Sequence, residues 1–320
     1  MGSGSGGPLG RWIGHWIGHW TFRNPLLRKE LRQRMRSGRT VLGLSLYLVI
    51  IGAVAFIFMY LNVQGQTLLL QPTRTAELFT FLSYLQLALI SFVTPGVAAG
   101  VISGERERQT LPVLLTTPLA PASVIFTKWV TSISFLSLLI IMTLPLYSIV
   151  FLFGGVAPSQ VLAVFLLQFM TLGAIAGVSI FWSTYVQRTG WSTVLSYATV
   201  ALLFIGAAVA GYLLDGVAAR NPDEGAWAWV GGICYAINPI YMQAALEASR
   251  GFFTPAFHNS LVESIFQTVQ THNLTGPGSW TLFVSLYIGG SVVMLILCTW
   301  RLRPGSIATA RRQILRWIAR

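Results

Sequence analysis

The stretch GERERQTL, residues 104–111, places four charged side chains in a row between two long apolar runs of sequence. Charges are scarce elsewhere, because only 9% of the chain is charged while 54% is hydrophobic. A soluble domain carries about 25% charged residues, so this composition is typical of a membrane protein. A solvated loop between two helices and a docking element for a cytosolic partner both fit the stretch. The side of the membrane on which it lies decides between them.

The apolar runs predict an all-α, polytopic membrane protein with six transmembrane helices. Each run is long enough to cross a hydrocarbon core of about 30 Å, which takes about 20 apolar residues. The alternating pattern of an outer-membrane barrel is not seen in the sequence. One transmembrane domain is therefore expected over residues 41–303, with spans at 41–61, 76–102, 123–153, 159–186, 191–214 and 280–300.

The basic residues predict which ends of the spans face the cytoplasm. With the N-terminus inside, the inner segments hold all but three of the 21 Lys and Arg residues. Cytoplasmic segments carry such an excess, so both termini are expected inside. Because the net charge of +12 follows the topology, it does not indicate a nucleic-acid partner. The inner segments are residues 1–40, 104–128, 187–190 and 301–320.

Basic amphipathic segments flank the transmembrane domain on its expected inner side. Residues 1–40 combine a flexible start, three Trp residues at four-residue spacing, and a basic helix that begins at Asn24-Pro25. Residues 304–320 form a basic cytoplasmic tail helix. Trp and Arg in this pattern favour the headgroup layer, so both segments are predicted to lie on membrane lipids. A plain topogenic charge cluster is the alternative for the first of them.

Residues 215–278 form a long connection that is expected on the outer side. An apolar run at 226–237 is too short to span a membrane. Asn238-Pro239 then opens a mildly amphipathic helix that reaches Ser249. We expect short helices that dip into the outer leaflet or cap a cavity. A surface loop without a role in transport is the alternative.

The sequence contains no motif for chemistry of its own. A phosphate-binding Gly-x-x-x-x-Gly-Lys-Ser/Thr loop is missing, since neither Lys29 nor Lys128 follows a glycine. Zincin and nucleophile-elbow motifs are missing too, so we expect no catalytic, cofactor-binding or metal-binding residues. The spans are nearly free of the ionisable residues that ion-coupled carriers use at membrane depth. If the protein moves a substrate, we expect the energy to enter from another chain.

This topology places residues 104–121 on the cytoplasmic face, between the second and third spans. Gly104 can end the second span. Residues 105–115 are predicted to form a short helix that stops before Pro118 and Pro121. The alternating Glu and Arg side chains of this helix offer a specific charged surface to a partner. The segment is therefore predicted to be a cytoplasmic coupling helix.

Three runs stand out together: NPLLRKEL at 24–31, ISGERERQTL at 102–111, and LLTTPL at 114–119 with Lys128 after it. They resemble the permease subunits of the ABC-2 family of ATP-binding-cassette transporters. The resemblance covers nearly the whole chain, including the amphipathic start, the six spans and the long outer connection. The chain departs from the family pattern at Gln109, where Gly is common, and at Pro112.

The resemblance implies the transmembrane permease subunit of an ABC transporter, an exporter in the plasma (inner) membrane of a prokaryote. ATP and Mg²⁺ would bind to a separate ABC ATPase subunit, so this chain would not be an enzyme by itself. A second permease copy or homologue would complete a dimer. A non-transporting signalling or mechanotransmission subunit is the alternative, and lipids, peptides, drugs, glycans and ions are all open as substrates.

The resemblance also implies which residues meet the ATPase. Charged contacts are expected first, followed by a leucine surface that packs into the partner. The implied ATPase-coupling residues are Glu105, Arg106, Glu107, Arg108, Gln109, Thr110, Leu111, Leu114 and Leu115. A second, weaker cytoplasmic contact is implied for Arg28, Lys29 and Glu30.

Overall fold

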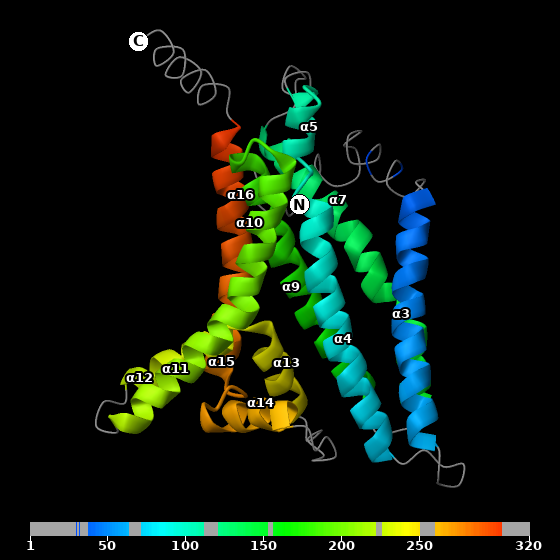
Figure 1. The fold of residues 1–320 in the computed structure, drawn as a ribbon, viewed down its shortest axis with the longest axis vertical. Coiled ribbons are helices and arrows are strands. Elements are labelled where there is room, and N and C mark those ends of the chain that lie inside the picture. Colours follow the sequence, from blue (N-terminus) through cyan, green and yellow to red (C-terminus); the bar gives the residue numbers. More distant parts are fainter. Residues whose placement is uncertain are drawn as a thin grey trace, which may run out of the picture.

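Every regular element in the described part of the chain is a helix (Figure 1). The structure, a computed structural model, describes residues 30, 32, 38–63, 72–111, 121–152, 156–221, 226–249 and 260–302. Five of the helices begin at a proline, whose missing N–H costs nothing in a first helical turn. The helices are α3 (Gly38–Val63), α4 (Pro72–Ala98), α5 (Ser103–Glu107), α7 (Pro121–Met142), α8 (Leu144–Leu152), α9 (Pro158–Tyr185), α10 (Thr189–Ala201), η1 (Leu202–Gly206), α11 (Ala207–Arg220), α12 (Ala226–Ile237), α13 (Pro239–Ala248), α14 (Ser260–Thr271), α15 (Pro277–Val284), η2 (Ser285–Gly289) and α16 (Gly290–Arg301).

Five helical stretches are long and apolar enough to cross a membrane, which confirms the prediction of an all-helical, multi-pass protein. The predicted first span falls in α3. The apolar stretch of α3 covers only Leu42–Ile57, which is shorter than a candidate span, so the sixth crossing stays a prediction. The five candidate spans are Ala76–Glu107, Pro121–Ser148, Pro158–Tyr185, Thr189–Arg220 and Pro277–Arg301.

Two of the predicted spans differ from the helices that form. The third is broken at Thr143 between α7 and α8, because Pro145 has no N–H to continue the helical hydrogen bonding. The fifth continues past its predicted end at Leu214, through Asp215 to Arg220. The Asp215 carboxylate does not stop the helix, because it accepts a hydrogen bond of 2.9 Å from the Tyr235 hydroxyl and pairs with His272.

Helix α9 lies at the centre of the bundle and contacts α4, α7, α10, α13 and α16. Small residues on α9 let its neighbours approach closely, as is common between membrane helices. A Cβ on Gly177 would lie 3.6 Å from Ser291 of α16. The carbonyl of Gly173 accepts a 3.1 Å hydrogen bond from the Trp129 indole of α7. Both glycines therefore lie where neighbouring helices pack closely against α9.

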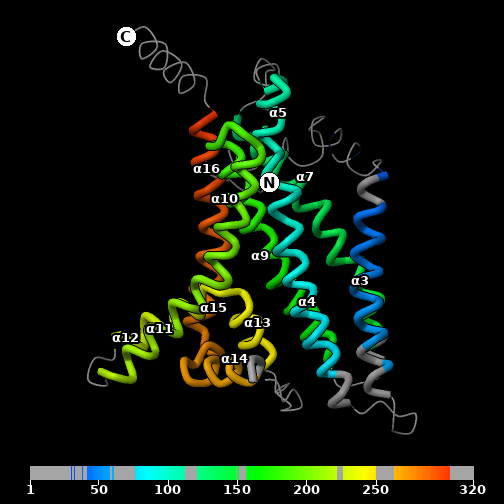
Figure 2. Tube along the Cα trace, viewed as in Figure 1, coloured from blue at the N-terminus to red at the C-terminus, as the bar shows by residue number. Residues whose placement is uncertain are grey.

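The described parts of the segments predicted to be cytoplasmic gather at one end of the bundle (Figures 1 and 2). Helix α5, the start of α10 and the end of α16 lie there, with the start of α3 toward the same end. Helices α11 to α14 lie at the opposite end, where α11 and α12 pair and lean away from the bundle. The two ends thus separate the charged stretch from the connection 215–278.

Each of the last two candidate spans contains one π-helical turn, η1 or η2, and both turns are tied to the junction between α12 and α13. The Asn238 side-chain amide donates to the carbonyl of Phe204 in η1 at 2.6 Å. The hydroxyl of Tyr287 in η2 donates to the carbonyl of Ile237 at 3.0 Å. The Asn238 side-chain oxygen also caps α13 by accepting from the N–H of Ile240. A π-turn leaves backbone groups without their usual helical partners, and here Asn238 supplies one of the replacements.

Candidate functional site

The charged stretch forms a much shorter helix than predicted. Helix α5 covers only Ser103–Glu107, so the prediction of a helix over residues 105–115 is wrong. The helix stops because Gln109 adopts a left-handed conformation, with φ of 58°. The N–H of Thr110 bonds to the carbonyl of Glu105, and the N–H of Gln109 bonds to the carbonyl of Arg106. These two bonds are a Schellman motif, in which glycine is the preferred left-handed residue.

Glu105 binds a lysine of its own chain. Its carboxylate accepts a hydrogen bond from the ammonium of Lys128 on α7. Glu30 of the N-terminal segment contacts the same ammonium and also accepts a 3.1 Å hydrogen bond from Thr131. Lys128 is only 7% exposed, so one buried cation joins α5, α7 and the segment around Glu30.

Arg106 and Glu107 bind the ends of two further helices. The Arg106 guanidinium donates to the carbonyls of Thr184 and Val186, both at 3.0 Å, where α9 ends. The Glu107 carboxylate accepts a 2.7 Å hydrogen bond from the N–H of Thr189, the first residue of α10. A cation at a helix C-terminus and an anion at an N-terminus complement the partial charges there. Both side chains therefore stabilise the α9–α10 turn.

A serine that the sequence reading missed fixes the backbone before α5. The Ser183 hydroxyl accepts hydrogen bonds of 2.9 Å from the N–H groups of both Ile102 and Ser103. The Ser192 hydroxyl of α10 donates to the carbonyl of Ala99 at 2.8 Å. Small polar residues commonly form hydrogen bonds between membrane helices. The presence of serines in apolar spans is thus the signal by which the sequence could have indicated Ser183 and Ser192.

The nine implied coupling residues divide into four groups. Glu105, Arg106 and Glu107 bind their own chain, while Arg108, Gln109 and Thr110 are exposed beyond the end of α5. Leu111 is only 6% exposed and packs with Ile102, Ile125 and Leu302, so it faces the bundle. The prediction that Leu111 offers an apolar surface to a partner is wrong. Leu114 and Leu115, and likewise Arg28 and Lys29 of the second contact, lie outside the described residues.

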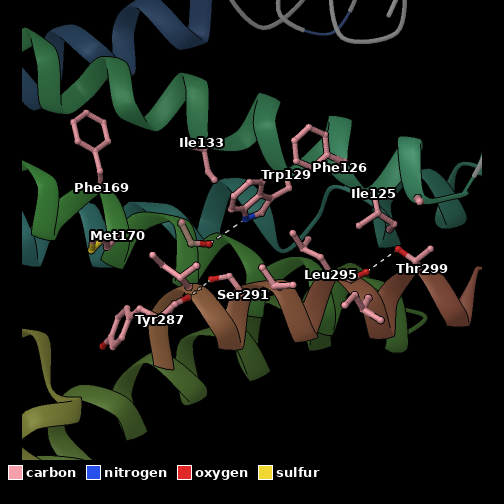
Figure 3. Close-up of a pocket in the computed structure, with 15 residues that line it drawn as sticks. Ile125, Phe126, Trp129, Ile133, Phe169, Met170, Tyr287, Ser291, Leu295 and Thr299 are labelled. Atoms are coloured by element: carbon pink, nitrogen blue, oxygen red, sulfur yellow. Dashed lines mark hydrogen bonds between the residues drawn. The ribbon is translucent and has the colours of Figure 1, made fainter. Parts of the chain in front are cut away.

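An apolar groove of about 490 Å³ lies between α7, α9 and the η2–α16 segment (Figure 3). Phe126, Trp129 and Phe169 line it from one side, and Leu295 and Thr299 from the other. Its polar groups already have partners inside the chain, since the Trp129 indole donates to Gly173 and the Thr299 hydroxyl donates to the carbonyl of Leu295 at 2.8 Å. The groove therefore offers contact to hydrocarbon and is lined by no Asp, Glu, His, Lys or Arg side chain among the described residues.

Within the described residues, no three His, Cys, Asp or Glu side chains come together as a metal site would require. The ion pairs there serve helix ends and helix junctions. The charged groups at this end of the bundle therefore have a structural role, because they hold helices in fixed relative positions.

Comparison with known proteins finds a matching protein family. A family model described as ABC-2 family transporter protein matches residues 25–304. The match includes α3 to α16 and the whole charged stretch. A search of curated proteins finds no match.

Proposed function

Because the chain belongs to the ABC-2 family of transporter proteins, we propose that it is the permease subunit of an ABC exporter, driven by ATP hydrolysis on a separate ATPase subunit. Membership of the family implies association with an ABC ATPase. ATP and Mg²⁺ act on that partner in this proposal, and a second permease copy or homologue completes the transporter. Export is the direction we propose.

One observation carries the coupling part of the proposal: α5 is bonded to three other helices at once. Glu105 holds α7 through Lys128, Arg106 holds the end of α9, and Glu107 holds the start of α10. The same short helix continues from α4 through a single turn. A force applied to α5 therefore acts on four long helices together.

We divide the charged stretch into a contact part and a transmitting part on the basis of exposure. We assign contact with the ATPase to the exposed residues Arg108, Gln109 and Thr110. Glu105, Arg106 and Glu107 then pass the movement on to the spans, rather than meeting the ATPase directly.

A mechanotransmission subunit is a second candidate, and the packing of the far end favours it. Tyr235, Met242, Phe266 and Phe283 form a buried core there, shared by α12, α13, α14 and α15. Such a packed end could pass movement to an outer partner. Transport by vesicles that contain the reconstituted complex separates the candidates, because only a transporter moves a cargo.

The contact surface is tested with Arg108→Glu. The wild-type chain is purified in mild detergent with its ABC ATPase, and the bound ATPase is quantified. A charge reversal inside an interface costs about 1.4 kcal/mol or more, so at least a tenfold loss of affinity is expected. Arg220→Glu is the matched control, because Arg220 is an exposed arginine at the opposite end of the bundle. Equal capture by wild type and Arg108→Glu would refute the assigned contact surface, and transport by the purified chain alone would refute the proposed function.

A further inference from the structure

A carboxylate is buried where the sequence suggested a mildly amphipathic outer helix. Glu247 of α13 is only 3% exposed, and α13 packs against α4, α9, α12 and α14. One oxygen of Glu247, Oε1, accepts a 3.0 Å hydrogen bond from the hydroxyl of Ser83 on α4. The carboxylate therefore reaches from α13 to α4 inside the packed end of the protein.

Three amide and phenol side chains surround the same serine. Gln243 of α13 donates to the Ser83 hydroxyl at 2.8 Å, and Gln168 of α9 donates to the Ser83 carbonyl at 3.1 Å. Tyr84 follows Ser83 on α4 and is coupled electrostatically to Glu247. We call these five residues the Ser83 cluster: Ser83, Tyr84, Gln168, Gln243 and Glu247.

Several buried oxygen atoms of the Ser83 cluster have no hydrogen-bond partner within the described residues. The second carboxylate oxygen of Glu247, Oε2, is buried and has no hydrogen-bond donor. The side-chain oxygens of Gln168 and Gln243 and the hydroxyl of Tyr84 are buried without partners as well. The oxygens of Glu247, Gln168 and Gln243 only accept hydrogen bonds, so these three cannot satisfy one another. The Tyr84 hydroxyl can donate, but it has no hydrogen-bond partner in the structure and so leaves all three unpaired. Burying an ionised carboxylate among them is costly unless its charge is neutralised.

The ionisable neighbours of Glu247 include no Lys or Arg among the described residues. Tyr84 of α4 and Tyr147 of α8 interact with Glu247 electrostatically. The helices that pack against α13 also carry the ionisable residues Glu77 (α4), Cys234 and Tyr235 (α12) and the exposed Glu263 (α14). Helix α9 presents the amide of Gln168. His272, just after α14, is paired with Asp215. In the part of the chain that the structure describes, no Lys or Arg therefore forms an ion pair with this carboxylate.

We propose that the Ser83 cluster is a proton-binding site, that Glu247 takes up the proton on Oε2, and that this proton keeps α13 seated between α4 and α9. The protonated carboxyl group donates to the side-chain oxygen of Gln243 or Gln168, which converts two unpaired acceptors into one hydrogen bond. No bond other than O–H is made, and the proton comes from the solvent. A proton is favoured over a metal ion because it needs no cavity.

The expected pH dependence has a definite sign. Burial raises the pKa of Glu247 from 4.5 to about 7. In the unfolded chain the carboxyl loses its proton at the lower value, and in the folded chain at the higher one. The stabilisation is thus complete below pH 4.5 and is lost as the pH rises through about 7. Above that pH the site holds a buried charge that weakens the docking of α13.

The proton is detected directly by infrared difference spectroscopy on the purified full-length protein. A protonated carboxyl group gives a carbonyl stretch that shifts in D₂O and disappears on ionisation. This band is expected to titrate near pH 7, to be absent in Glu247→Gln, and to persist in Glu263→Gln, the matched change on the neighbouring helix. The wild-type titration needs no variant to fold, so it tests the site even if Glu247→Gln does not fold.

A second measurement separates a proton from a metal cation. The thermal midpoint of the wild type is followed from acidic to alkaline pH in sodium and in choline salts of equal ionic strength. A midpoint that falls as the pH rises, equally in both salts, supports the proposal. A carboxylate that stays ionised throughout this range overturns it. A midpoint that depends on sodium and not on pH also overturns it, in favour of a metal site.

Discussion

Replacing Lys128 with methionine should destabilise the protein and disconnect α5 from its neighbours. Methionine keeps most of the side-chain volume but removes the ammonium group. The carboxylates of Glu30 and Glu105 then lose their shared cation in a site where the Lys128 side chain is 8% exposed. Removing one partner of a fully buried ion pair costs about 3–5 kcal/mol. Because the side chains of Glu30 and Glu105 are 14% and 26% exposed, water recovers part of this cost. We therefore expect a loss of about 2–4 kcal/mol.

Reversible unfolding in mixed micelles measures this loss of unfolding free energy. Combined substitutions then show how much of it comes from the interaction of Lys128 with Glu30 and Glu105. The triple variant Lys128→Met, Glu30→Gln, Glu105→Gln removes all three charges, so it should regain a large part of the lost stability. The same variants report on coupling: Lys128→Met should still capture the ATPase but stimulate its ATP hydrolysis less. An unfolding free energy within about 0.5 kcal/mol of wild type, the usual range for surface substitutions, would refute the buried-cation reasoning.

Two further predictions concern the backbone. Gln109→Gly should stabilise the protein by about 1 kcal/mol, because glycine adopts the left-handed conformation of residue 109 without the steric cost that a Cβ brings; a thermal midpoint below that of wild type would contradict this. Gly211→Ala should cost about 1–3 kcal/mol, since a new Cβ would lie 2.7 Å from the Tyr235 ring. Gly216→Ala on the same helix meets no atom within 4 Å and should instead stabilise by about 1 kcal/mol, so equal effects at the two glycines would refute the packing of α11 on α12.

The helices and their order were predictable because they depend on local signals. Apolar length identifies the long helices, and the prolines at 72, 121, 158, 239 and 277 mark five helix starts. The length of α5 was not predictable in this way, because the pattern of Glu, Arg and Leu allows a longer helix. Its end depends on the left-handed conformation of Gln109, a position where glycine would have been an obvious stop signal.

The partners of the charged residues were beyond sequence reasoning for a different reason. Arg106 and Glu107 bind backbone groups of Thr184, Val186 and Thr189, and a backbone group leaves no mark on the side-chain pattern. Glu247 was predicted to lie in an outer amphipathic helix, since six of the seven residues from 243 to 249 are polar or small and allow a solvent-exposed face. Its burial arises only when α13 packs against α4 and α9.

Because Arg106 and Glu107 of α5 bind backbone atoms, the sequence around the α9–α10 turn can change during evolution without loss of these hydrogen bonds. Carbonyl and amide groups are the same in every residue except proline, which lacks the amide proton. The residues at positions 184 and 186 can therefore be substituted while Arg106 keeps both of its carbonyl acceptors. Position 189 is open to any residue that retains an N–H for Glu107. Among relatives we expect the residues at positions 184, 186 and 189 to vary and the residues of α5 to be restricted. The contact between α5 and the α9–α10 turn would then be preserved mainly by the sequence of α5.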